Sequence, residues 1–452
     1  MNINDTRAWL AAPIRLGVML LLGCLAQGAA AQKPAAPKGG TIKVGVLHSL
    51  SGTMAISETT LKDTVLMMID EQNQLGGLLG KKLEAVVVDP ASNWPLFAEK
   101  ARELLQKEKV AVVFGCWTSV SRKSVLPVFE ELNGLLFYPV QYEGEESSKN
   151  VFYTGAAPNQ QAIPAVDYLM NDIGVKRWVL AGTDYVYPRT TNKILEAYLK
   201  AKGVKDADIL IHYTPFGYSD WQSIVAEIKK FGSAGTKTGV VSTINGDANV
   251  PFYKELGNQN VPFYKELGNQ KVSAEDIPVV AFSVGEEELS GIDTKPLVGH
   301  LAAWNYFMSI DTPENKAFIK QWHAFIEDPK RVTNDPMEAH YIGFKLWVKA
   351  VEKAKTTDTD AVAKAILGLE VPNLTGGKAV MLKNHHLTKP VFIGEIQEDG
   401  QFAVVWQTPG TVEGDAWSDY LEGSKDLIAD WTPPIECGNY NVKTKKCSGQ
   451  KY

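Results

Sequence analysis

The stretch VAVVFGCWTS, residues 110–119, joins an apolar run to a group of polar and aromatic side chains. The run at 110–114 is typical of a strand buried on both faces, and a helical pattern follows it from Ser119 to Leu132. Similar runs stand at 42–47, 83–88 and 135–138, so strands recur roughly every 25 to 40 residues with helical patterns between them. This βαβ repetition predicts a parallel sheet with both faces covered by helices.

The pattern restarts in the second half of the chain. Apolar runs at 178–182, 209–211, 240–244 and 279–282 alternate with helical patterns around 193–200 and 221–231. The fold class is therefore predicted to be α/β, with two doubly wound parallel-sheet lobes. In such sheets ligands bind beyond the carboxyl ends of the strands, which predicts a ligand cleft between the lobes.

The N-terminus has the pattern of a secretory signal. Arg7 and Arg15 precede the apolar run 16–22, and Ala29-Ala30-Ala31 fits a cleavage site, so the mature chain is expected to begin at Gln32. A lipid anchor at Cys24 is the alternative, but Leu22 fits that cleavage pattern poorly. No later segment reaches eighteen apolar residues, so we expect a soluble, exported protein.

The composition argues against several classes of function. The 452 residues carry a net charge of −6 and contain no basic run, which disfavours nucleic acid as a partner. The seven histidines show no metal spacing, and no G-x-S-x-G motif is present. Residues 76–82 are expected to form a turn and not a phosphate loop, because Lys82 stands where Ser or Thr would hold magnesium. We therefore predict no catalytic residue, no metal site and no cofactor.

Three cysteines follow the expected cleavage site. Cys437 and Cys447 lie in a polar tail and are expected to form a disulfide in an oxidising compartment. Cys116 would then be unpaired, as a small buried residue at a strand end.

An identical 11-residue segment occurs twice in tandem, at 249–259 and 260–270. Eleven residues keep helical phase, but Gly257 and Pro262 would interrupt one long helix. A local duplication is expected, with one copy forming a bulge on the surface.

Polar and aromatic residues at the strand ends are the candidate ligand contacts. Aromatic faces combined with a hydroxyl and an amide suit a small, flat, neutral polar molecule. Each residue also has a structural alternative: tyrosines at strand ends often pack, Ser119 could be a helix N-cap, and Glu286 could favour a helix start. The candidates are Trp117, Ser119, Tyr138, Gln141, Tyr142, Tyr187, Asp247 and Glu286.

Several of these stretches resemble the type I periplasmic binding proteins, and most closely the urea and short-chain-amide receptors of ABC transporters. The resemblance rests on 41–45 with 50–52, 73–80, GCWTS at 115–119, YPVQYEG at 138–144 and DYVYPR at 184–189, and segments at 283–288, 300–307 and 334–341 extend it. It implies two lobes, three hinge crossings and a ligand enclosed by lobe closure.

The resemblance also implies roles for single residues. Ser119 is similar to the position whose hydroxyl and amide bind the ligand, Trp117 to a wall position, and Tyr187 to the second-lobe tyrosine that closes on the ligand. Glu286 resembles the acid that takes the α-ammonium in amino-acid receptors. Val140 replaces a threonine whose hydroxyl serves an α-carboxylate, which favours urea over an amino acid. The relatives carry one copy of the 11-residue segment.

The expected domain organisation follows. Residues 1–31 form the signal peptide, 32–40 a leader, 41–155 with about 310–390 the first lobe, 156–309 with about 391–436 the second lobe, and 437–452 a tail. The expected function is capture of urea, or a close short amide, in the periplasm for an inner-membrane ABC permease. The alternatives are a branched-chain amino-acid-binding protein, an amide-sensing regulator, which the signal peptide disfavours, and an exported amidohydrolase, for which no motif is seen.

Overall fold

A computed structural model of the chain describes residues 39–249, 273–290, 293–421, 427–430, 437–441, 444 and 446–447. The predicted signal peptide, with Cys24 and most of the leader, lies outside the described residues. So does the tandem repeat beyond Asn249.

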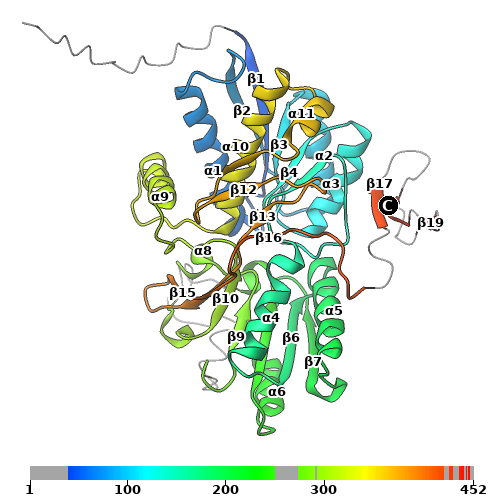
Figure 1. Ribbon diagram of the computed structural model, residues 1–452, viewed down its shortest axis with the longest axis vertical. Helices are drawn as coiled ribbons and strands as arrows, with labels where there is room; N and C mark the ends of the chain where they lie inside the picture. The colour runs from blue at the N-terminus through cyan, green and yellow to red at the C-terminus, as the bar shows by residue number, and fades with distance from the viewer. Residues whose placement is uncertain are drawn as a thin grey trace, which may run out of the picture. The chain divides into compact units, whose positions relative to one another are not determined.

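The first sheet contains five strands, all parallel, in the order β2-β1-β3-β4-β5 (Figure 1). Its central strands are buried on both faces, as the apolar runs predict. Gly115 is required where two strands approach closely, because a Cβ there would lie 2.4 Å from the Leu47 carbonyl oxygen. The strands are β1 (Thr41–Leu47), β2 (Lys82–Val88), β3 (Val112–Gly115), β4 (Leu136–Tyr138) and β5 (Val151–Tyr153).

Helices from two distant parts of the chain cover this sheet. Phe344 and Trp347 of the late helix α10 pack on Phe114 of β3, with ring centroids 5.5 and 6.2 Å away. The first lobe therefore has one core built from both parts. The expected lobe boundaries stay a prediction. The helices are α1 (Ala55–Gln74), α2 (Trp94–Arg102) with the π-helical turn η1 (Glu103–Lys107), α3 (Ser119–Glu131), α9 (Pro313–Ile326), α10 (Asp335–Ala354) and α11 (Thr359–Ile366).

The second sheet has seven strands in the order β15-β14-β10-β9-β8-β6-β7. The four predicted strands, β6 to β9, are parallel as expected, and β10 extends them in the same direction. β14 pairs antiparallel with β10, and β15 pairs antiparallel with β14, which the sequence interpretation did not predict. The link between β14 and β15 is a short hairpin, which can join only antiparallel strands. The strands are β6 (Arg177–Thr183), β7 (Ile209–Thr214), β8 (Thr238–Thr243), β9 (Val279–Ala281), β10 (Leu301–Trp304), β14 (Phe392–Ile396) and β15 (Phe402–Gln407).

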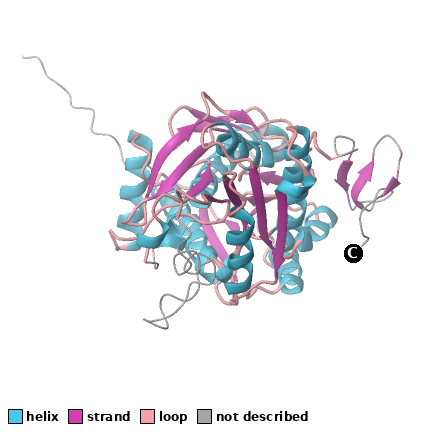
Figure 2. Cartoon of the chain, turned by 90° about the horizontal axis from the view of Figure 1, so that it is seen from below, coloured by secondary structure: helices cyan, strands magenta, loops and turns pink. Residues whose placement is uncertain are grey.

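Both faces of the second sheet are covered, and Figure 2 shows helices on either side of the strands. α4 and α5 pack on one face, while α6 and α8 pack on the other. The helices are α4 (Ala162–Asn171), α5 (Val186–Ala201), α6 (Gln222–Gly232) and α8 (Glu286–Leu289), with 3₁₀ turns η2 (Pro158–Gln160), η3 (Asp206–Asp208), η4 (Gly246–Ala248) and η5 (Lys295–Leu297).

Up to β15, the described chain passes between the two lobes three times: after β5, after β10 and before β14. These passages correspond to the three hinge crossings that the resemblance implies. Short antiparallel pairs complete the described chain. They are β11 (Glu370–Pro372) with β12 (Lys378–Val380), β13 (Thr388–Lys389) with β16 (Val412–Glu413), and β17 (Leu427–Asp430) with β18 (Cys437–Asn441) and β19 (Lys446–Cys447).

The structure tests the expectation for Cys116 but not the predicted disulfide between Cys437 and Cys447. Cys116 is free and fully buried, as expected, and burial raises the pKa of its thiol. Its backbone is left-handed, with φ of 67°, at the sharp turn out of β3. The backbone register places Cys447 opposite Tyr440. The side chains of Cys437 and Cys447 lie outside the described residues, so their disulfide stays a prediction.

Candidate functional site

Loops at the carboxyl ends of the strands in the two lobes contact each other through hydrogen bonds. Gln141, after β4, donates its Nε2 to the Phe282 carbonyl and to Ser283 Oγ after β9, both at 2.7 Å. Ser57 of α1 donates to Glu288 Oε1 of α8 at 2.8 Å. The strand-end residues that the sequence predicts on separate lobes are therefore brought to one region of the molecule.

Aromatic rings bridge the same region. Phe216, which follows β7, packs on Tyr185 of the second lobe and on Trp94 of the first, with centroids 4.9 and 5.8 Å apart. Tyr187 lies next to Tyr185, at 6.2 Å between ring centroids. Neither Trp94 nor Phe216 was among the predicted contacts, because nothing in their local sequence sets them apart from core aromatics.

Asp247 lies in the short turn η4, and its side chain is outside the described part of the chain. The turn itself faces the first lobe, since a Cβ on Gly246 would lie 3.1 Å from Met54 Sδ. Asp247 thus stays a predicted contact at a position where the lobes meet.

Ser119 is the first residue of α3, and the helix cap is its neighbour. Thr118 accepts the backbone N–H of Ser121 at 3.1 Å, so the alternative of Ser119 as a plain N-cap is wrong. The Ser119 hydroxyl instead donates to Glu143 Oε2 and accepts from Arg122 Nη1, which lies 3.1 Å away. A residue type that caps helices well is used here in a side-chain network.

That network is a buried group of two cations and two carboxylates. Arg122 binds Glu143 at 3.0 Å and Glu146 at 2.7 Å, and Lys123 binds Glu146 at 2.7 Å. Burial alone would raise the pKa of Glu146, but the positive charges of Arg122 and Lys123 outweigh it and lower that pKa to about 2. The formal charges of these four side chains sum to zero, so the wall of the first lobe presents no excess charge here.

Tyr138 and Tyr142 form part of this wall and have their hydroxyls occupied. Tyr138 donates to the Trp117 carbonyl at 2.5 Å, and the Tyr142 hydroxyl lies 2.5 Å from His386 Nε2. Both rings stack on the Arg122 guanidinium, at 4.7 and 4.6 Å. These hydroxyl bonds and ring contacts fix the loop that carries Gln141, so both tyrosines support the wall and neither presents a free hydroxyl.

Two buried polar atoms in this region make no hydrogen bond of ordinary geometry in the described chain. They are Gln141 Oε1, an acceptor, and the Tyr187 hydroxyl, which can donate or accept. Gln141 and Ser283 lie beside the Tyr187 hydroxyl and partly offset the rise in its pKa that burial causes. Both side chains are 3% exposed, so water does not readily replace the missing bonds. Buried polar groups are nearly always paired in folded proteins, and an unpaired one has a cost that a ligand can remove.

Glu286 is the first residue of α8, and its carboxyl group bonds to the backbone. Its Oε1 accepts the Met308 N–H at 2.6 Å, and burial, with Glu288 and Asp335 nearby, raises its pKa to about 8. The carboxyl is therefore largely protonated at neutral pH. Trp117 is 3% exposed at the end of β3, where its carbonyl holds Tyr138.

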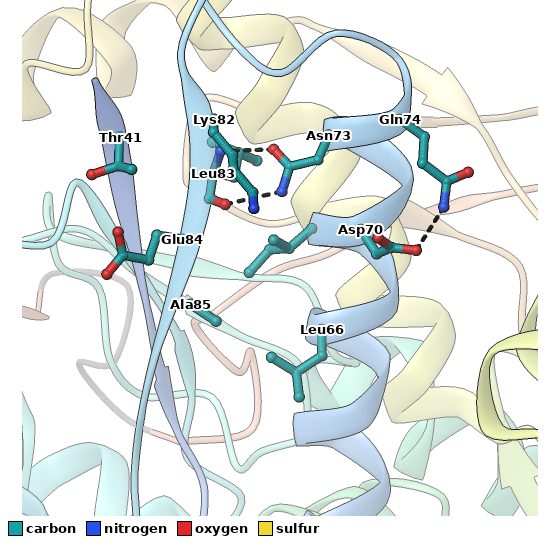
Figure 3. Close-up of a pocket in the computed structure, with 10 residues that line it drawn as sticks. Thr41, Leu66, Asp70, Asn73, Gln74, Lys82, Leu83, Glu84 and Ala85 are labelled. Carbon is teal, nitrogen blue, oxygen red and sulfur yellow. Dashed lines mark hydrogen bonds between the residues drawn. The ribbon is translucent and has the colours of Figure 1, made fainter. Parts of the chain in front are cut away.

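A surface groove of about 630 Å³ lies elsewhere, between α1 and the edge strand β2 (Figure 3). Thr41 and Lys82 line it at the amino ends of their strands, opposite to the carboxyl ends where ligands bind. Asn73 at its margin is occupied, because its amide pairs with both backbone groups of Leu83.

The described residues contain neither a cluster of metal-ligating side chains nor a helix suited to a membrane. No group of three or more His, Cys, Asp or Glu side chains in the described ranges is placed to hold a metal ion. Of the helices that the structure describes, none has both the length and the apolar character needed to cross a bilayer.

The model of the periplasmic binding protein domain matches residues 42–423, nearly the whole described chain. The chain belongs to the periplasmic binding protein family. Its two lobes have the fold of the type I periplasmic binding proteins.

Similar proteins agree with this assignment. The Leu/Ile/Val-binding protein homolog 7 of Brucella melitensis is 25% identical over 395 residues, covering 82% of this binding protein and 93% of the relative. A Rhodopseudomonas palustris solute-binding protein of an ABC transporter, solved with p-hydroxybenzoic acid, has a TM-score of 0.70 at 21% identity, covering 83% and 98% of the two chains.

One further match is local. A stretch of 116 residues is 29% identical to limonene hydroxylase of Geobacillus stearothermophilus, covering 25% of the binding protein. The chain spans about a fifth of that relative's length (21%), so the match says nothing of the whole enzyme's activity here.

The sequence interpretation missed the residues that hold the predicted contacts of this binding protein in place. Arg122 bonds to Ser119 and Glu143 and is itself held by Glu146, and Ser283 bonds to Gln141. His48 and His340, 2.8 Å apart at Nε2, join the end of β1 to α10. Arg122, one helical turn after Ser119, was the only local sequence signal for this side-chain network. A basic residue at such a position is also typical of a solvated helix face.

Glu286 should make the stability of the binding protein depend on pH. The native carboxyl keeps its proton up to about pH 8, while the unfolded one loses it near its ordinary value of 4.5, so stability falls as pH rises between those values. From pH 6.5 to 8 the wild type should lose about 2 kcal/mol more than Glu286→Gln, measured by guanidinium chloride unfolding.

Other titrating groups do not obscure the comparison of the two proteins. Glu338, whose pKa burial raises to about 7, also titrates in this window, but it is present in both proteins and its contribution cancels. His300 and His386 have pKa values lowered by burial to about 4, so they change stability only below the unfolded value of 6.5. Glu314→Gln, on the exposed side of α9, is the matched control and should keep the wild-type slope. Equal slopes for wild type and Glu286→Gln would show that Glu286 is ionised in the native protein.

Proposed function

We propose that this binding protein captures urea, or a close short amide, and delivers it to an inner-membrane ABC permease. The observation that carries the proposal is the pair of buried atoms that make no hydrogen bond of ordinary geometry, Gln141 Oε1 and the Tyr187 hydroxyl. An amide offers N–H groups to the acceptor and a carbonyl oxygen to the hydroxyl, so one small ligand supplies both missing bonds.

The charges around the site favour a neutral ligand. Arg122 is fully engaged by two glutamates, so its charge is not free for a carboxylate. Glu286, with its pKa raised to about 8, is a poor partner for an α-ammonium at neutral pH. A zwitterionic amino acid would lose hydration at both ends and find neither charge matched.

The aromatic faces of Trp117, Tyr185 and Tyr187 suit a flat molecule. Four non-hydrogen atoms at about −1.5 kcal/mol each limit urea to roughly −6 kcal/mol, which is a Kd of tens of micromolar. Tighter binding would require every group of the ligand to be paired and lobe closure to cost little.

Export to the periplasm belongs to the same proposal. The charged and apolar pattern of residues 1–31 supports signal-directed secretion, with cleavage before Gln32 favoured over lipid attachment at Cys24. The Cys437–Cys447 disulfide would be formed in that compartment. Mass measurement of the mature chain, with and without reduction, tests both points.

Isothermal titration with urea and leucine tests the ligand assignment. We expect urea to bind at least about tenfold more tightly, a difference of about 1.4 kcal/mol. The second candidate is a branched-chain amino-acid-binding protein, which the name of the Brucella relative favours. Leucine binding as tight as urea, or tighter, would establish that candidate and reject urea.

Tyr187→Phe should separate binding from stability. The hydroxyl makes no hydrogen bond of ordinary geometry in the described chain, so its removal should leave the melting temperature unchanged or slightly raised while urea affinity falls about tenfold. Tyr198→Phe is the matched control, because its hydroxyl donates to Asp167 between α4 and α5. That variant should lose about 1 kcal/mol of stability and keep its affinity. The proposal fails at this residue if Tyr187→Phe binds urea as well as the wild type.

A further inference from the structure

The hydrogen of the Ser119 hydroxyl is already committed within the first lobe. The hydroxyl has one hydrogen to donate and two lone pairs to accept with. Its hydrogen goes to Glu143 Oε2, and one lone pair takes the Arg122 Nη1–H at 3.1 Å. The remaining lone pair has no donor among the described residues, because the Tyr138 hydroxyl beside it gives its hydrogen to the Trp117 carbonyl.

The direction of these bonds follows from the charges. An ionised Glu143 can only accept hydrogen bonds, and Arg122 can only donate them. The serine between them must therefore donate to Glu143 and accept from Arg122. All three side chains are at most 1% exposed, so water does not compete for these positions.

Ser119 and Glu143 face the second lobe. α3, which Ser119 opens, contacts α5 of that lobe. Burial raises the pKa of Tyr187, and the negative charge of Glu143 raises it further, so this carboxylate lies near a tyrosine of the candidate site.

We propose that Ser119 accepts an N–H of the ligand instead of donating to its carbonyl oxygen, and that Arg122 and Glu143 are positioning residues that set this polarity. The inference rests on the proposed function, because it assigns an orientation to a urea-like ligand. The carbonyl oxygen of the ligand then accepts from the Tyr187 hydroxyl. The site therefore selects molecules that present a free N–H to the first lobe.

Glu143→Gln should reverse the direction of the hydrogen bond between this side chain and Ser119 while keeping the size of the side chain. The Arg122 donors require an oxygen, so the glutamine oxygen should turn to Arg122 and its NH₂ should turn to Ser119. Ser119 then accepts from Gln and recovers its hydrogen for the ligand. A structural role for Glu143 would weaken all ligands alike, whereas this reversal changes which ligand atom is preferred.

Titration with urea and thiourea provides the readout. The two are close in shape and share their N–H groups, but the thiocarbonyl sulfur is a weak acceptor. Ser119→Ala should weaken both ligands by the same factor, about tenfold, because the lost bond is to an N–H. Glu143→Gln should raise the urea-to-thiourea affinity ratio by about threefold or more over the wild type, because Ser119 now reaches for the oxygen.

The outcomes are distinct. A Ser119→Ala variant that loses urea affinity while thiourea affinity is kept would show a bond to the carbonyl oxygen and overturn the inference, with the proposed function intact. An unchanged ratio in Glu143→Gln overturns the positioning role. Failure of the wild type to bind urea rejects the proposed function and this inference with it. If Ser119→Ala does not fold by thermal melting, Ser119→Cys gives the same comparison.

Discussion

Replacing Arg122 by methionine is expected to lower the free energy of unfolding by about 3–5 kcal/mol. Methionine keeps most of the side-chain volume but leaves Glu143 and Glu146 buried, with only Lys123 to balance them. An uncompensated buried charge costs much more than the net value of the pair that it belonged to. Guanidinium chloride is the denaturant of choice, because urea is the proposed ligand.

Arg102→Met is the matched control for this measurement. Arg102 binds Glu131 at 2.6 Å, but the two side chains are 41% and 58% exposed, so water replaces the lost bonds. That variant should change stability by less than about 1 kcal/mol. If Arg122→Met lowers the free energy of unfolding no more than the control does, Glu143 and Glu146 are balanced without the guanidinium. The ion-pair network would then not stabilise the first lobe.

Gly155→Ala is expected to cost about 3 kcal/mol or more and to weaken urea binding. Gly155 lies on the first hinge crossing, where a Cβ would lie 2.1 Å from the Val140 carbonyl carbon and 2.7 Å from the Gln141 backbone nitrogen. These are backbone atoms, so no side-chain rotation relieves the clash. The loop that carries Gln141 must move, and the acceptor proposed for the ligand moves with it.

Gly410→Ala is the comparison, because a Cβ there meets nothing within 4 Å. It should alter stability by no more than about 0.5 kcal/mol. Guanidinium chloride unfolding measures the stability of both variants, and calorimetry measures their affinity for urea. Wild-type stability and affinity in Gly155→Ala would mean that the hinge crossing can move away from the Val140 loop at little cost.

Sequence periodicity predicted most of the fold correctly because it is a local property. A run such as 110–114 is apolar at every position only if both faces of its strand are buried, and helical patterns between such runs imply parallel order. The antiparallel strands β14 and β15 were missed, because short apolar segments late in the chain give no sign of which neighbour they pair with.

The sequence by itself determined the α/β class, the two lobes and which polar and aromatic residues stand at the strand ends, because the burial pattern and the order of the elements are local properties of consecutive residues. Only the tertiary structure decided which atoms at those ends are free. Gln141 bonds to Ser283, 142 residues away, and Ser119 bonds to Glu143, 24 residues away. Whether a hydroxyl donates or accepts depends on the charges packed around it, and those neighbours are assembled only by folding.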